Sequence, residues 1–301
     1  MSPTSTGSRT KEGMVDVPGG KVWYKIVGAG AKGTPVLTLH GGPGTPHDYL
    51  EPLEDLSNDR PVIFYDQLGC GNSDKPNDTS LWTVDRFVEE LAVLRKSLKL
   101  DKVHLLGHSW GTILAVEYIS TRKPRGICSM VLSGPALSAS RWTSDTRALL
   151  AKLPKDAQKA FLDGEAAGVF DSPEFQAAVM TFYKKHLCRM DPWPDCCNRT
   201  FEKVGKPVLL HMWGPSEFIA TGTLKDFELT GLLKEIGVPV LFTVGQYDEA
   251  SPKTTRYYHS LLPGSEIHVF KGASHCHHVE RREEYVRVVR DFLTRADGRN
   301  K

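Results

Sequence analysis

Gly107-His108-Ser109-Trp110-Gly111 is the stretch that decides the fold of this chain. The short apolar run at 103–106 predicts a buried strand before it, and residues 112–118 predict a helix after it. A sharp turn from strand to helix strains the serine and exposes its hydroxyl, and glycines on both sides leave the space that this turn needs. The sequence therefore predicts that Ser109 is a nucleophile at the end of a strand.

Short apolar runs alternate with helical stretches through most of the chain. This alternation is typical of a mostly parallel sheet flanked by helices on both faces. Residues 83–98 and 282–295 are predicted amphipathic helices. The other predicted strands are 22–27, 36–39, 62–65, 127–132, 238–243 and 267–270.

The alternation stops between residues 138 and 230. Helical pieces at 145–152 and 155–163 occur there, without a clear strand. We interpret 138–230 as a helical cap inserted into an α/β core formed by 14–137 and 231–301. Residues 1–13 are polar and are predicted to form a disordered arm.

Composition narrows the possible function classes. The 301 residues carry 38 Lys and Arg against 36 Asp and Glu, a net charge of +2 without a basic run, so we expect no nucleic-acid partner. No apolar run has the length of a membrane span, and the first residues lack the apolar centre of a secretory signal. The six cysteines have no repeated spacing and are expected to be free thiols in a cytoplasmic protein.

A serine nucleophile needs a base, and the base needs an orienting acid. In this strand–helix order both partners follow the serine, each just after a late strand. Asp248 follows the predicted strand 238–243, and His275 follows 267–270, so both are expected at the carboxyl edge of the sheet. His277 and His278 are nearby rivals for the base. We predict no metal site, because adjacent residues of one segment cannot wrap a tetrahedral ion.

The oxyanion formed by serine attack must meet backbone N–H groups. One comes from the residue after the nucleophile, here Trp110, and the other from a turn after an early strand. The turn at 40–44 follows the predicted strand 36–39, and we predict Gly42 as its donor, with Gly41 as the alternative.

Five motifs resemble those of the proline iminopeptidase family, and the resemblance extends from about residue 14 to 295. Within that family, the chain is most similar to the branch with tricorn-interacting aminopeptidases and L-amino-acid amidases. The resemblance implies an α/β-hydrolase fold with an inserted helical cap, a Ser–Asp–His triad and no cofactor. It also implies removal of N-terminal residues, often proline, from short peptides or amino-acid amides. The motifs are His40-Gly-Gly-Pro-Gly44, Tyr65-Asp-Gln-Leu-Gly-Cys-Gly-Asn-Ser73, the stretch at 107–111, Gly214-Pro-Ser-Glu-Phe218 and Tyr247-Asp-Glu249.

The same resemblance implies that Glu217 and Glu249 bind the α-ammonium of the substrate. Trp213 and Gln246 depart from the family pattern beside these motifs, which leaves the preference for proline open. Two alternatives to the aminopeptidase also stay open: an esterase or lactonase using the same triad, and a slow hydrolase whose role is ligand binding. The oligomeric state is not indicated by any motif.

Overall fold

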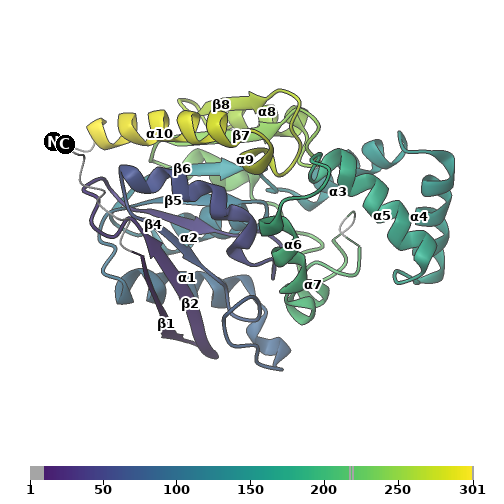
Figure 1. Ribbon diagram of the computed structural model, residues 1–301, viewed down its shortest axis with the longest axis horizontal. Helices are drawn as coiled ribbons and strands as arrows, with labels where there is room; N and C mark the ends of the chain where they lie inside the picture. Colours follow the sequence, from purple (N-terminus) through teal and green to yellow (C-terminus); the bar gives the residue numbers. More distant parts are fainter. Residues whose placement is uncertain (1–9, 217, 219, 300–301) are drawn as a thin grey trace.

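The computed structural model describes residues 10–216, 218 and 220–299. Its centre is a twisted sheet with the strand order β1-β2-β4-β3-β5-β6-β7-β8 (Figure 1). β1 and β2 are antiparallel to their neighbours, and the pairs from β4 to β8 are parallel. The strands are β1 Lys11–Val17, β2 Gly20–Val27, β3 Val36–Leu39, β4 Val62–Tyr65, β5 Val103–His108, β6 Ile127–Ser133, β7 Val240–Gly245 and β8 Glu266–Phe270.

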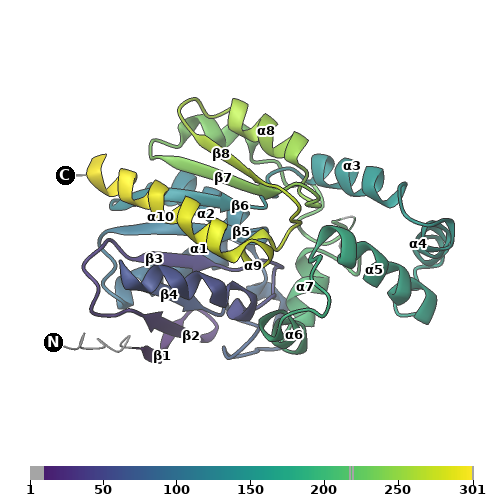
Figure 2. The same cartoon turned by 45° about the horizontal axis from the view of Figure 1, so that its top comes forward.

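Helices cover both faces of the sheet, because strand residues alternate between two apolar cores. Leu37 and Leu105 face the core beneath α1 and α2, whereas Val36 and Leu106 face the core beneath η1 and α10. Figure 2 shows α10 on one face of the sheet and α1 and α2 on the other. Such burial on both faces explains why the strands read as continuous apolar runs in the sequence. The core helices are η1 His47–Asn58, η2 Thr79–Leu81, α1 Val84–Ser97, α2 Trp110–Arg122, η3 Thr230–Glu235, α8 Pro252–Ser260, α9 His277–Glu280 and α10 Arg282–Arg299.

The segment between β6 and β7 is helical and lies beyond one end of the sheet (Figures 1 and 2). Part of it has a small apolar core of its own, built around Phe161, Phe175 and Phe182. The first helix begins earlier than the sequence predicted, because the hydroxyl of Ser138 accepts from the N–H of Arg141 and caps it there. The helices are α3 Ala139–Leu150, α4 Lys155–Ala167, α5 Pro173–His186, α6 Asp195–Glu202 and α7 Lys206–Met212.

The first strand corrects one prediction. Residues 11–13 were predicted to belong to a disordered arm, but they are part of β1, which pairs with β2 from Lys11 opposite Ile26 to Val17 opposite Gly20. Most side chains of β1 are exposed, so the strand is stabilised by backbone pairing at the edge of the sheet. For the same reason its sequence lacks the apolar run that would predict a strand. Residues 1–9 lie outside the described part of the chain.

Candidate active site

Ser109 occupies the turn that the sequence predicted for it. It connects β5 to α2 with φ 54° and ψ −121°, a strained conformation for a residue other than glycine. A Cβ on Gly107 would lie 2.3 Å from the carbonyl oxygen of Gly111, and one on Gly111 would lie 2.0 Å from that of Leu39. A larger residue at either flanking position would therefore clash with the backbone. Ser109 itself lines a cavity.

Asp248 and His275 lie together at the carboxyl edge of the sheet, after β7 and β8. His275 Nδ1 is 2.7 Å from Asp248 Oδ1, and both side chains are buried. The N–H groups of Gly245 and Ala250 donate to the Asp248 carboxylate at 3.2 and 2.8 Å. Burial alone would raise the pKa of Asp248, but the facing His275, the nearby His277 and the hydrogen bond from Ala250 hold that pKa below its ordinary value. The pair therefore has the geometry of an ionised acid that orients an imidazole.

The two predicted rivals of His275 have their hydrogen bonds elsewhere, although His277 Nδ1 also lies 3.6 Å from Asp248 Oδ2. His277 Nε2 is 3.0 Å from the hydroxyls of both Ser133 and Thr243, and His278 Nε2 is 3.1 Å from the carbonyl oxygen of Tyr49. Both rings are buried and neither lines the cavity, whereas His275 does. This arrangement favours His275 as the base.

The turn after β3 distinguishes between its two candidate oxyanion donors. The N–H of Gly41 donates to the hydroxyl of Tyr49 at 2.8 Å, so it is already used inside the protein. Gly42 has φ +106°, and a Cβ there would lie 2.6 Å from the N atoms of Gly44 and Thr45. Trp110 is the first residue of α2, whose opening N–H groups have no acceptor within the helix. This geometry favours Gly42 and Trp110.

A buried chain of hydrogen bonds connects the three loops of the site, and sequence reasoning missed it. The Tyr49 hydroxyl accepts from Gly41 and lies 2.9 Å from His108 Nδ1, while His108 Nε2 lies 3.0 Å from the carbonyl oxygen of His275. Burial lowers the pKa of His108 well below its ordinary value, so this ring is neutral. Its Nε2–H therefore donates to His275, and its Nδ1 accepts from the Tyr49 hydroxyl. This chain of hydrogen bonds thus fixes the relative positions of the turn after β3, the serine turn and the histidine loop.

The C-terminal end of α5 is fastened to the same histidine loop. The N–H of His275 donates to the carbonyl oxygen of His186 at 3.0 Å, and that of Cys276 donates to Leu187 at 2.8 Å. The segment between β6 and β7 therefore contacts the site through its backbone as well as through side chains.

Of the two predicted amine-binding acids, only Glu249 lies within the described residues. Glu249 is fully buried, and its Oε1 is 3.8 Å from His275 Nε2. Glu217 lies outside the described residues, although its chain neighbours Ser216 and Phe218 line the cavity. Of the two departures from the family pattern, Trp213 also lines the cavity, whereas Gln246 is exposed and its Oε1 accepts from the N–H of Gly272.

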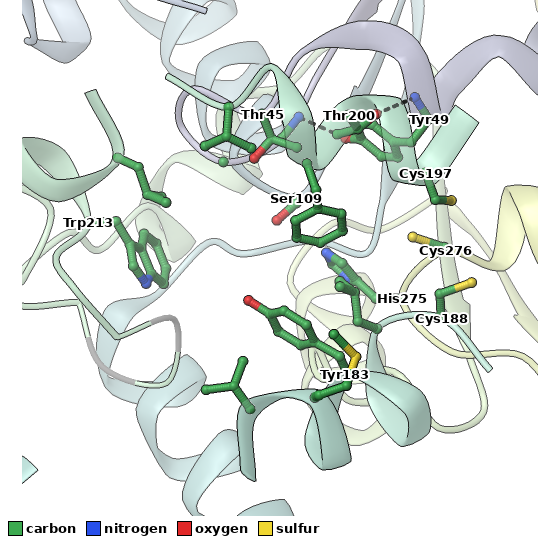
Figure 3. Close-up of a pocket in the computed structure, with 18 of the residues that line it drawn as sticks. Thr45, Tyr49, Ser109, Tyr183, Cys188, Cys197, Thr200, Trp213, His275 and Cys276 are labelled. Atoms are coloured by element: carbon green, nitrogen blue, oxygen red, sulfur yellow. Dashed lines mark hydrogen bonds between the residues drawn. The ribbon is translucent and has the colours of Figure 1, made fainter. Parts of the chain in front are cut away.

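A cavity of about 890 Å³ joins these groups to the helices between β6 and β7 (Figure 3). Ser109 and His275 lie on its wall, with Trp213 and Tyr183 on different sides of the serine. The serine, the histidine and the candidate oxyanion donor Gly42 therefore face one space large enough for a substrate.

Comparison with known proteins identifies the family. The family model for the α/β hydrolase fold matches residues 34–281. A proline iminopeptidase of Heyndrickxia coagulans is 48% identical over 94% of this chain and 98% of its own length. A second, from Saccharolobus solfataricus, is 39% identical over 94% of this chain and 92% of its own. The chain belongs to the proline iminopeptidase family.

Solved structures agree with this assignment to the proline iminopeptidase family. The crystal structure of a proline iminopeptidase of Mycobacterium smegmatis superposes with a TM-score of 0.88 at 33% identity, over 97% of this chain and all of that one. The crystal structure of VinJ gives 0.91 at 34% identity, over 95% of this chain and 99% of its own. An esterase of Exiguobacterium antarcticum, 19% identical with a TM-score of 0.69, shares the fold alone. The prediction of an α/β-hydrolase enzyme of this family is confirmed.

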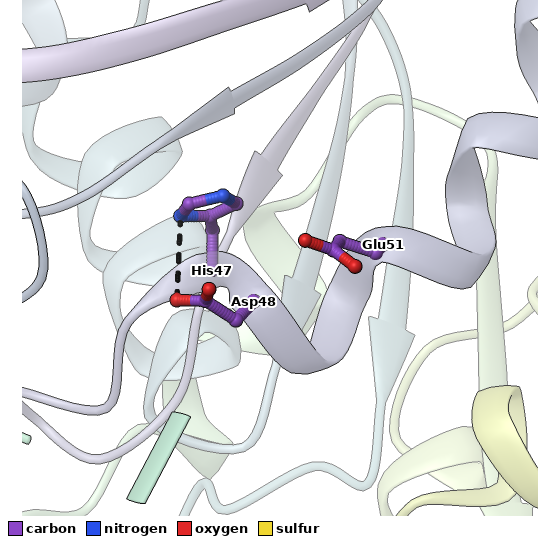
Figure 4. A group of neighbouring side chains, drawn as sticks. All are labelled: His47, Asp48 and Glu51. Carbon is purple, nitrogen blue, oxygen red and sulfur yellow. Dashed lines mark ion pairs between the residues drawn. The ribbon is translucent and has the colours of Figure 1, made fainter. Parts of the chain in front are cut away.

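One group of side chains in this family member has the spacing of a metal site. Among the described residues, only His47, Asp48 and Glu51 bring three ligand atoms close together (Figure 4). Asp48 Oδ1 already pairs with Lys203 Nζ at 2.7 Å and with Arg199 Nε at 3.4 Å, and Arg199 also pairs with Glu51. We therefore interpret the group as an ion-pair network that fastens α6 to η1.

No helix in the described ranges is long and apolar enough to cross a bilayer.

Proposed function

We propose that this chain is a serine aminopeptidase that releases the N-terminal amino acid, proline or another small apolar residue, from short peptides or amino-acid amides. The observation that carries the proposal is a buried carboxylate, Glu249, whose Oε1 lies 3.8 Å from His275 Nε2. A carboxylate so near the base has a use when the substrate brings a cation to it, and an α-ammonium is that cation. A neutral ester has no such group.

In the proposed mechanism, Ser109 Oγ attacks the scissile carbonyl and His275 Nε2 takes its proton. Asp248 holds His275 through Nδ1 at 2.7 Å and stabilises the imidazolium that forms. The N–H groups of Gly42 and Trp110 donate to the oxyanion. His275 then protonates the leaving amine, and water hydrolyses the acyl-enzyme by the same route in reverse. No cofactor takes part in these steps.

The α-ammonium is proposed to lie against Glu249 and Glu217. The assignment of Glu217 rests on its motif alone. An esterase or lactonase remains the alternative, because it would use the same triad with a different pocket. We also propose a cytoplasmic location, because the six cysteines, all within the described residues, are free thiols.

The triad is tested by labelling and substitution. Ser109→Ala should lower kcat at least about a thousandfold, because triad members act as a unit. A fluorophosphonate should add its mass to the peptide that contains Ser109. His275→Gln should also abolish activity, whereas His277→Gln should retain most of it. A label on another serine would overturn the assignment, and so would a dead His277→Gln variant beside an active His275→Gln variant.

The amine site is tested by comparing free and acetylated substrates. An ion pair in a closed pocket contributes roughly 2–3 kcal/mol. Glu249→Gln should therefore lower kcat/KM on amino-acid amides about thirty- to a hundredfold, at tenfold per ~1.4 kcal/mol. N-acetylation should cause a similar loss in the unmodified enzyme and add little to that of the variant. Equal rates for acetylated and free substrates would favour the esterase.

A further inference from the structure

The cavity is larger than the proposed reaction needs. At about 890 Å³ it lies near the upper end of the roughly 300–1,000 Å³ typical of pockets for drug-sized ligands. One amino-acyl unit beside Ser109 fills only a small part of such a space. The remaining volume must therefore receive the other half of the substrate, which leaves as the amine.

One aromatic wall lies on the side of the triad that we assign to the amino-acyl unit. The rings of Trp142 and Trp213 are 5.6 Å apart, and Trp142 is 6.1 Å from His275. Ser251, two residues after Glu249, donates its hydroxyl to Asp145 at 2.7 Å, so the Glu249 loop packs against the α3 helix that carries Trp142. Glu249, which is buried and is not itself among the residues that line the cavity, and Trp142 of this wall therefore lie beside the same residue, His275.

A second aromatic wall lies elsewhere in the cavity. The rings of Trp193 and Phe201 stack at 5.4 Å, and Tyr183 is 6.3 and 6.0 Å from them. These residues come from α5, α6 and the loop between them, and Figure 3 shows Tyr183 and Trp213 on different sides of Ser109. If the amino-acyl unit lies beside Trp142 and Trp213, the leaving amine lies toward this second wall.

Three large apolar side chains of the cavity are left in contact with solvent, and one of them, Phe201, belongs to the second wall. Phe201 is 43% exposed, Met180 42% and Leu210 53%, and all three line the cavity. Exposed large apolar side chains that gather at one concave surface mark a binding site for an apolar group. By contrast Leu162, 62% exposed on α4, does not line the cavity.

We propose that the amine released by this enzyme carries a bulky aromatic group, which packs against Tyr183, Trp193 and Phe201. The substrate class is then an amino acid joined by an amide to a large, flat, apolar amine, or a peptide whose second residue is aromatic. A small amine such as ammonia or glycinamide does not contact this wall and leaves its side chains exposed to water. This inference rests on the proposed function, because it uses the direction in which the amino-acyl unit lies.

The test uses L-prolyl amides of ethylamine, 2-phenylethylamine and 2-(1-naphthyl)ethylamine. All three leaving groups are primary alkylamines of similar basicity, so differences in rate report binding of the ring and not leaving-group chemistry. We expect kcat/KM to rise by about thirtyfold or more from the ethyl to the naphthylethyl amide, as burial of an aromatic ring implies. A rise of less than threefold would overturn the proposal.

Two substitutions locate the effect. Phe201→Ala should reduce the ratio of kcat/KM between naphthylethyl and ethyl amides at least about fivefold, because the ring loses its stacking partner. Leu162→Ala, an equally conservative loss of an exposed apolar side chain, should leave the ratio unchanged. An unchanged ratio in Phe201→Ala would contradict the assignment of the wall, and circular dichroism would confirm that both variants fold.

Binding separates this inference from the proposed function. The three amides are titrated into Ser109→Ala by calorimetry, where no hydrolysis occurs, and the naphthylethyl amide should bind most tightly. If the unmodified enzyme hydrolyses none of the amides, the proposed function fails while this ranking still decides the inference. If it hydrolyses all three at equal rates and Ser109→Ala binds them equally, the inference fails and the proposed function stands.

Discussion

Removing the hydroxyl of Tyr49 tests whether the buried hydrogen-bond chain positions the catalytic loops. Tyr49 is 5% exposed, and its hydroxyl accepts from Gly41 at 2.8 Å and lies 2.9 Å from His108 Nδ1. Tyr49→Phe leaves a buried donor and a buried acceptor without partners, at about 1–3 kcal/mol for each. We expect a loss of roughly 2–6 kcal/mol in the free energy of unfolding and a fall in Tm of roughly 4–12 °C.

The same change should slow the reaction. The freed Gly41 precedes Gly42, the proposed oxyanion donor, and removal of one such donor costs about 10²–10³ in kcat. A donor that is loosened but still present should cost less, and we expect kcat to fall about tenfold with KM nearly unchanged. The assay is steady-state hydrolysis of an amino-acid amide, beside thermal unfolding followed by circular dichroism.

Tyr118→Phe is the matched control. Tyr118 is 3% exposed, and its hydroxyl accepts from Arg95 Nη1 at 2.8 Å near the far end of α2, away from the cavity. Its loss should lower Tm by a comparable amount without a change in kcat. If both variants reduce kcat equally, or if Tyr49→Phe reduces Tm alone, Tyr49 is only a stabilising residue and the positioning argument is wrong.

Three further predictions concern other parts of the molecule. Burial lowers the pKa of His40 and His277 to about 4, so between pH 6.5 and 4 the unfolded chain binds protons that the folded chain does not. The free energy of unfolding should therefore decrease as the pH is lowered through this window, by on the order of 3 kcal/mol per histidine. A Tm that does not change between these pH values would contradict this prediction. A hydrogen bond from its neighbouring cysteine lowers the pKa of Cys196 to about 7, so iodoacetamide should label this residue before the five buried cysteines, at a rate that rises through pH 7, as peptide mass spectrometry can show. Asp48→Asn should loosen α6 from η1, since Asp48 is the shared partner of two cations there; trypsin should cut near α6 about five- to thirtyfold faster, and an unchanged rate would show that the ion pairs do not hold the helix.

The parts of the site that follow strands were predictable from the sequence. Ser109, Asp248 and His275 each follow within a few residues of the end of a strand, and parallel strands bring their carboxyl ends to one edge. The sequence alone does not distinguish Gly42 from Gly41 as the oxyanion donor, because the distinction depends on where the Gly41 N–H is directed. That direction is set by Tyr49, whose hydroxyl meets the turn only in the folded protein.

Other features lacked a local signal. The edge strand β1 has an exposed, polar composition that resembles a disordered arm, so only its pairing with β2 reveals it. The second aromatic wall is equally hidden, because Tyr183, Trp193 and Phe201 have no common spacing and come together through the packing of α5 and α6. The burial of Glu249 beside His275 is likewise a tertiary property.

The backbone hydrogen bonds between α5 and the histidine loop connect one wall of the cavity to His275, the proposed base. His275 and Cys276 are bonded through their backbones to the last turn of α5, while α4 and the rest of α5 share an apolar core of their own. Those two hydrogen bonds join this helix pair directly to the loop that carries the imidazole, so a displacement of one acts on the other. The position of α5 is therefore coupled to that of His275, the proposed base, and to the contact of His275 with Asp248.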